Sequence, residues 1–125
     1  MYENDISFLI RKAIFKIYNS LGPGLFESVY VAVLVYELQQ LNLEVKKEVA
    51  LPMVYEGIKF EAGFRIDILV NDLVIVEIKS IETLAEVHHK QLLTYLRLSG
   101  LKLGLLVNFN SANIAESIFR KVNGL

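Results

Sequence analysis

Two carboxylates and one lysine interrupt two neighbouring apolar stretches of the chain. Asp67 lies in the first stretch, residues 64–70, and Glu77 and Lys79 lie in the second, residues 73–79. Burying a charge costs several kcal/mol unless the ion is paired or bound to a metal. Carboxylates suit Mg²⁺, which can polarise a phosphoryl oxygen, and a nearby ammonium can orient the attacking water and stabilise developing charge. The pattern therefore predicts a divalent-metal site of the kind that hydrolyses phosphodiester bonds.

The hydrophobic pattern also predicts how the two stretches pair as antiparallel strands. A three-residue turn, residues 71–73, leaves an unbroken apolar face on residues 64–70, because side chains alternate along a strand. It also opposes Asp67 with Glu77, whose Cβ atoms would lie about 4.5–5.5 Å apart. A two-residue turn would mix polar and apolar side chains on both faces. The apolar pairs expected in the favoured register are Val70 with Val74, Ile68 with Val76, and Ile66 with Ile78.

A cross-strand salt bridge is the alternative explanation of the same charges. The expected register places Arg65 opposite Lys79, so these two cations could neutralise Asp67 and Glu77. An aspartate followed by Glu-x-Lys is a weak motif by itself. The residues alone therefore support the metal site and the salt bridge equally.

A third acid begins an expected helix. Glu27 follows Gly24 and lies one turn before Tyr30 on the same helix face. An acid in the first turn complements the helix dipole, and this structural explanation is sufficient for Glu27 taken alone.

A later helix carries Gln91 and Tyr95, which are four residues apart and share a face. The adjacent His88 and His89 point about 100° apart on a helix, so they cannot easily chelate one ion. We expect His88 to line the same cleft as Gln91, and His89 to be exposed or to line a cleft.

Composition limits the class of protein. The 125 residues fit one compact domain, residues 1–125. No apolar run reaches the roughly 18–20 residues that span a bilayer, and the N-terminus is not a secretory signal, so we expect a cytoplasmic protein without membrane contact. Cysteine is absent, which excludes disulfides and thiolate metal sites. The hydrophobic content of 54% and mean hydropathy of +0.42 favour a buried interface and hence a homodimer.

The net charge of −1 excludes a global positive field that would attract nucleic acid. Any nucleic-acid binding must then rest on the metal ion and on a local basic patch. The candidate patch consists of Lys46, Lys47, Arg65, Lys79, Arg97 and Lys102.

Hydrophobic periodicity predicts the order α-α-β-β-β-β-α-β. The expected helices are residues 3–20, 27–40 and 84–99, and the expected strands are residues 43–50, 52–60, 64–70, 73–79 and 103–109. Residues 114–123 could form a short helix or an edge strand. The strand–helix–strand connection predicts that residues 103–109 lie parallel to residues 73–79 through a right-handed crossover.

Together and in this order, the motifs resemble those of the GxxExxY protein family, a branch of the PD-(D/E)xK nuclease-like superfamily. Ile66 stands where the superfamily name expects proline. The resemblance covers nearly the whole chain and implies an α/β fold with a restriction-endonuclease-like core, a mixed four- to five-stranded sheet flanked by helices. The matching residues are Gly24, Glu27, Tyr30, Asp67, Glu77-Ile78-Lys79, Gln91 and Tyr95.

The resemblance also implies a role for each matching side chain. Lys79 would be the catalytic lysine, and the helix with Gln91 and Tyr95 would contact substrate or the attacking water. The implied metal is Mg²⁺, with Mn²⁺ as a substitute, held by Asp67, Glu77 and Glu27. The implied catalytic residues are Glu27, Asp67, Glu77, Lys79, Gln91 and Tyr95.

The leading functional hypothesis is a Mg²⁺-dependent nuclease that hydrolyses phosphodiester bonds in nucleic acid, with DNA favoured over RNA. One alternative is a non-catalytic nucleic-acid-binding or regulatory module that retains the fold. Another is an oligomeric interaction protein with structural acids. The intact Asp67, Glu77 and Lys79 argue against both alternatives, whereas the lack of a basic surplus favours them.

Overall fold

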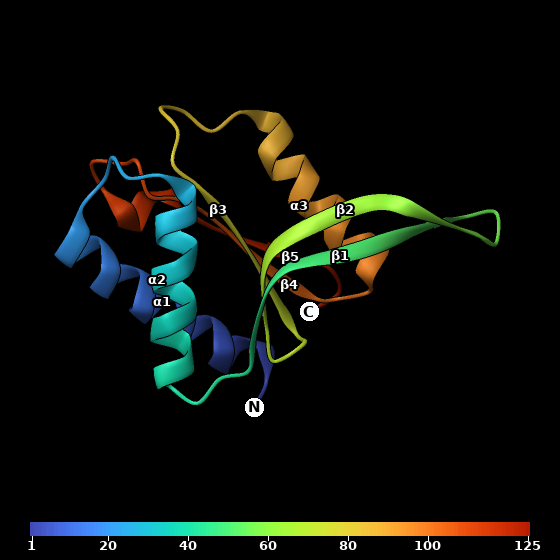
Figure 1. Cartoon of the computed structure of the whole chain (residues 1–125), viewed down its shortest axis with the longest axis horizontal. Helices are drawn as coiled ribbons and strands as arrows, with labels where there is room; N and C mark the ends of the chain where they lie inside the picture. The colour runs from blue at the N-terminus through green and yellow to red at the C-terminus, as the bar shows by residue number, and fades with distance from the viewer.

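The computed structural model describes the backbone of residues 1–125 and every side chain except that of Ala62. Two helices cover one side of the sheet and a third helix covers the other side (Figure 1). Among the described residues, no helix is both long enough and apolar enough to cross a membrane. The elements in chain order are α1 (Glu3–Leu21), α2 (Glu27–Gln40), β1 (Val45–Tyr55), β2 (Ile58–Val70), β3 (Val74–Lys79), α3 (Glu86–Ser99), β4 (Leu103–Asn108), the 3₁₀ turn η1 (Ile114–Ser117) and β5 (Ile118–Val122).

The five strands form one open mixed sheet in the order β1-β2-β3-β4-β5. β3 and β4 are parallel, and the other neighbours are antiparallel. This confirms the expected α/β class, the mixed sheet and the parallel step across α3. The C-terminal segment forms both expected structures, because η1 leads directly into the edge strand β5.

The expected division of the first strands is wrong. Three strands were expected over residues 43–70, but the chain forms two long strands that join at Glu56 and Gly57. Pro52 does not end β1. It lies where the β1–β2 register shifts, between Leu51 and Met53, on a strand at the edge of the sheet. Proline is tolerated at bulges and on edge strands, which is why the turn signal failed there.

Hydrophobic side chains form a separate cluster on each face of the sheet. The first lies between the sheet and α1 and α2, and includes Ile10, Ile14 and Leu34, all fully buried. The second lies between the sheet and α3, and includes Leu92 and Leu96. Alternation along β3 and β4 supplies both clusters, since successive side chains of a strand point to opposite faces.

β1 and β2 change faces together part-way along their length. In β2, Ile68 packs in the α1–α2 cluster but Ile66 packs in the α3 cluster, although regular alternation would place them on one face. In β1, Val45 and Val49 divide between the clusters in the same way. The unbroken apolar face expected for residues 64–70 is therefore wrong. The change of face occurs at Asp67 and, on β1, at residue 48.

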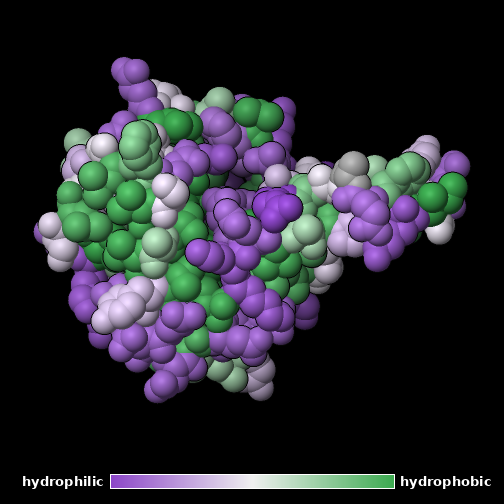
Figure 2. All heavy atoms as spheres, in the orientation of Figure 1, coloured by the Kyte–Doolittle hydropathy of each residue, from purple (hydrophilic) through white to green (hydrophobic). Residues whose placement is uncertain are grey.

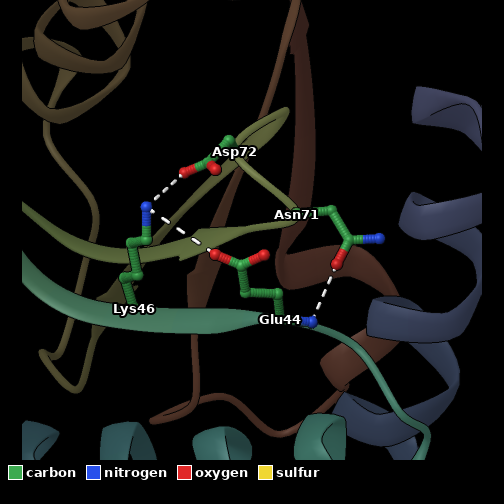
Figure 3. A network of polar contacts seen from close by, with 4 residues as sticks. All are labelled: Glu44, Lys46, Asn71 and Asp72. Atoms are coloured by element: carbon green, nitrogen blue, oxygen red, sulfur yellow. Dashed lines mark hydrogen bonds and ion pairs between the residues drawn. The ribbon is translucent and has the colours of Figure 1, made fainter.

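Polar contacts tie the turn between β2 and β3 to the start of β1, as shown in Figure 3. Asn71 and Glu44 exchange hydrogen bonds of 2.8 Å, through the Asn71 backbone N–H and its side-chain oxygen. Lys46 Nζ lies 2.8 Å from Asp72 Oδ1, and this carboxylate raises the pKa of Lys46. Val70 pairs with Val74, which confirms the expected three-residue turn.

Candidate active site

The β2–β3 ladder ends just before the two acids. The last backbone pair is Ile68 with Val76, so the expected pairing of Ile66 with Ile78 is not formed. Beyond this pair, side-chain carboxylates replace backbone carbonyls as acceptors. Asp67 Oδ2 accepts a hydrogen bond from the Ile78 N–H at 2.8 Å. Glu77 Oε2 accepts one from the Asp67 N–H at 3.3 Å. The two acids therefore oppose each other, at the point where β2 turns away from β3.

Glu77 is the most perturbed acid of this site. Its side chain is 6% exposed, and burial together with the neighbouring Asp67 raises its pKa to about 9, against a smaller opposing effect of Lys79. Among the side chains that the structure describes, Glu77 Oε1 is the one buried polar atom without a hydrogen-bond partner. An uncompensated oxygen of this kind fits a cation ligand, because a divalent ion would neutralise both carboxylates.

The salt-bridge alternative is not supported. Within the described part of the chain, the ion pairs involve neither Asp67 nor Glu77. Arg65 donates instead to the backbone carbonyl of Glu48, at 3.3 Å. Lys79 is half-buried and acts on Glu77 through its charge alone.

Glu27 connects the start of α2 to the end of β3. Its Oε2 accepts a hydrogen bond from the Ser80 N–H at 3.1 Å, directly after Lys79. The Ser80 hydroxyl in turn donates to the Leu25 carbonyl at 2.5 Å. Glu27 and Asp67 also line one pocket of about 260 Å³, together with Lys47.

Tyr30 fixes the loop that presents Glu27. Its ring is fully buried and stacks on Phe109 at a centroid distance of 4.2 Å. Its hydroxyl donates to the Gly22 carbonyl at 2.5 Å and accepts from the Leu25 N–H at 3.2 Å. Gly24, with a φ of +99°, allows the loop to turn between these contacts. The Gly-x-x-Glu-x-x-Tyr spacing therefore builds a support for the acid.

The structure does not gather the three expected metal ligands into one cluster. Among the described residues, no three acidic, histidine or cysteine side chains lie close enough to hold one ion. The donor set in place is Asp67 and Glu77. Two carboxylates suit Mg²⁺, which retains several waters and takes one or two protein carboxylates. Glu27 as a direct ligand stays a prediction.

α3 brings Tyr95 to the same site. The Tyr95 ring stacks on Phe64 at 4.4 Å, and its side chain is 8% exposed. Burial, with the charges of Glu77 and Asp67, raises the Tyr95 pKa, and Gln91 acts in the opposite direction. The tyrosine hydroxyl and both acids therefore lie within electrostatic reach of one another, with Gln91 exposed beside them.

His88 supports the start of α3, and its place in the cleft beside Gln91 stays a prediction. Its Nδ1 accepts a hydrogen bond from the Ala85 N–H at 2.9 Å, at the start of α3. Such a bond satisfies a backbone donor that the first helical turn leaves free. His89 packs edge-on against Phe119 and lines a separate pocket, and burial lowers its pKa.

Comparison with known families matches residues 4–121 to the sequence model of the PD-(D/E)XK nuclease superfamily. The chain belongs to the PD-(D/E)XK nuclease superfamily. Comparison with curated proteins and with solved structures gives no match. Membership of the GxxExxY branch stays a prediction.

The PD-(D/E)XK assignment covers both acids, Lys79 and the helices that border them. Sequence reasoning missed Asn108, a buried residue that supports the loop after Lys79. Its amide donates to the Ile81 carbonyl at 2.9 Å and accepts from the Ile81 N–H at 3.1 Å. The available signal was a polar residue at the end of an otherwise apolar strand, which is unusual for a strand buried on both faces.

The expected basic patch is divided in the folded chain. Lys46 is occupied by Asp72, whereas Lys47 lines the pocket with Glu27. Arg97 lines a different pocket, between α3 and the end of β5. Hydrophilic residues do gather in the middle of the face shown in Figure 2, between the apolar surface at its left and the projecting ribbon at its right.

Proposed function

We propose that this chain hydrolyses phosphodiester bonds in nucleic acid, with DNA favoured over RNA, using Mg²⁺ or Mn²⁺ held by Asp67 and Glu77. Membership of the nuclease superfamily supports a nucleic-acid substrate. The observation that carries the proposal is the buried Glu77, with an unsatisfied oxygen and a raised pKa beside a second carboxylate. A protein without cysteine is compatible with the reducing cytoplasm, where we expect it to act.

The metal would supply Lewis-acid polarisation of the phosphoryl oxygen and a more acidic bound water. Lys79 extends from the same strand as Glu77, and its ammonium would stabilise charge that develops on the phosphate. Tyr95 and Gln91 would orient the substrate from α3. Glu27 would hold Ser80, and hence the end of β3, in place through the hydrogen bond already formed.

Cleavage assays on purified protein test this proposal. Linear duplex DNA, single-stranded DNA and RNA are each incubated with Mg²⁺, with Mn²⁺ and with chelator. We expect metal-dependent cleavage that Lys79→Ala lowers by about a hundredfold or more, as for other losses of transition-state charge stabilisation. Asp67→Ala should lower both cleavage and metal binding. Glu116→Ala, which removes an exposed acid on η1, is the matched control and should cleave like the wild type.

Calorimetric titration with Mg²⁺ separates the metal site from the chemistry. Equal residual cleavage by wild type, Asp67→Ala and Lys79→Ala would refute the nuclease proposal. Mg²⁺ binding and nucleic-acid binding without cleavage would instead support the non-catalytic module. A wild type that binds no divalent ion would refute the metal site itself.

A further inference from the structure

The end of the β1–β2 ribbon, residues 53–61, extends away from both hydrophobic clusters (Figure 1). We call these residues the arm. Beyond the register shift at Leu51, the arm pairs only with itself, through Met53–Phe60, Val54–Lys59 and Tyr55–Ile58. A two-stranded ribbon alone is marginally stable in water. An arm of this kind therefore calls for a partner.

The two faces of the arm differ sharply. Paired residues share a face, so Met53, Tyr55, Ile58 and Phe60 form one apolar face. Tyr55 is 62% exposed and Ile58 is 59% exposed. The other face carries the exposed Val54, together with Lys59 and Glu61, whose charged groups lie 3.9 Å apart.

The net negative charge of the arm disfavours the nucleic-acid backbone as this partner. Glu56 and Glu61 outnumber Lys59, so the arm is net negative. Contacts to phosphates require lysine or arginine side chains, and each such contact contributes to the salt-dependent affinity for nucleic acid. A protein surface fits the arm better.

The arm has a free backbone edge on β2. In the described residues, β2 pairs with β3 only from Ile68 onward, so the arm portion of β2 is bonded only to β1. Glu56 and Gly57 form a two-residue turn with positive φ angles of 51° and 76°, and Tyr55 and Ile58 close it. Such a closing pair is hydrogen-bonded, and bonded and non-bonded pairs alternate along the ladder. The backbone groups of Lys59 therefore point to the free edge.

The charged residues of the arm determine in which register this edge can pair with the same edge of a second copy. In an antiparallel two-fold contact, an axis through residue 59 or 61 would oppose like charges. An axis through Phe60 opposes Lys59 with Glu61 of the second copy, and Glu61 with Lys59, while the two Phe60 side chains meet across the axis. Opposite charges and aromatic pairs directly across a ladder are stabilising, and like charges are destabilising.

We propose that the chain forms a homodimer by antiparallel pairing of the β2 edges of two arms, centred on Phe60. The contact is self-complementary, as a two-fold interface requires, and it joins two ribbons into one four-stranded sheet. The proposal is independent of the phosphodiesterase activity, because the arm contains none of the site residues.

Light scattering and sedimentation over the micromolar range test the charge pairing. The wild type should be a dimer, and Lys59→Glu should weaken dimerisation by about tenfold or more, because two opposite-charge pairs become like-charge pairs. The double variant Lys59→Glu, Glu61→Lys should restore it. Lys12→Glu, an exposed lysine on α1, is the matched control and should stay dimeric. A monomeric wild type, or a dimer that Lys59→Glu leaves unchanged, would overturn the proposal.

Cross-linking tests the position of the axis. The chain has no cysteine, so Phe60→Cys introduces a single thiol per copy. Mild oxidation should convert Phe60→Cys to a covalent dimer rapidly, since directly opposed Cβ atoms lie about 4.5–5.5 Å apart in a sheet. Val54→Cys, on the other strand of the arm, should cross-link much more slowly. Equal rates for both variants would contradict the register. Circular-dichroism melts of the same variants show whether each remains folded.

Discussion

Replacing Glu77 with glutamine should stabilise the metal-free protein at neutral pH. The pKa of Glu77 in the folded chain is about 9, above its ordinary value of 4.5. The folded chain therefore keeps a proton that the unfolded chain has released. The free energy of unfolding is therefore highest below pH 4.5, where Glu77 is protonated in both states. It falls progressively as the pH rises to about 9, by up to about 1.36 kcal/mol per pH unit.

At pH 7 this loss amounts to about 3 kcal/mol, or about 10 °C in Tm for a chain of this size. Glu77→Gln cannot ionise, so its melting temperature should exceed that of the wild type by about that amount at pH 7. The difference should shrink towards pH 5 and grow towards pH 9.

Circular-dichroism melts in chelator, from pH 5 to pH 9, measure the effect. Glu116→Gln, which removes an exposed glutamate on η1, controls for the change in net charge. Added Mg²⁺ should raise the Tm of the wild type more at pH 8 than at pH 5, and should leave Glu77→Gln unchanged. Parallel pH profiles for wild type and Glu77→Gln would refute the inference that Glu77 holds a buried proton.

Two further substitutions test how the site is supported. Glu48 has a φ of +53° where β1 changes face, so Glu48→Gly should stabilise the fold by about 1 kcal/mol in urea unfolding, whereas Glu48→Ala should not. A gain from both, or from neither, would contradict a strained backbone. Tyr30→Phe keeps the stacking on Phe109 but removes two hydrogen bonds, and should cost about 1–3 kcal/mol in the same assay. Unchanged stability would show that the hydroxyl does not hold the loop.

The local pattern was sufficient to predict the β2–β3 hairpin. Val70 and Val74 are apolar, Asn71 and Asp72 form the turn, and the period of two then opposes Asp67 with Glu77. These contacts join residues that are close in sequence, so the hydrophobic pattern of this one segment is enough to predict them.

The change of face could not be predicted in the same way. It depends on Glu48 in β1 adopting a left-handed backbone next to β2, and on Arg65 reaching its carbonyl. A glutamate is not a signal for positive φ, since glycine and asparagine are the usual residues there. The roles of His88 and Asn108 were missed for a related reason: both bond to backbone groups whose position only the folded chain defines.

Asp67 and Glu77 lie at the boundary between the two hydrophobic clusters, where the apolar side chains of β2 change from one face of the sheet to the other. Asp67 belongs to neither cluster, and Glu77 contributes a carboxylate to this boundary and no apolar group to either side. Exchanging these side chains for others of similar size changes the charge of the site without creating a cavity in the hydrophobic core. Changes at these acids should therefore act on the fold through charge and through the backbone hydrogen bonds that Asp67 and Glu77 accept, and not through the hydrophobic core.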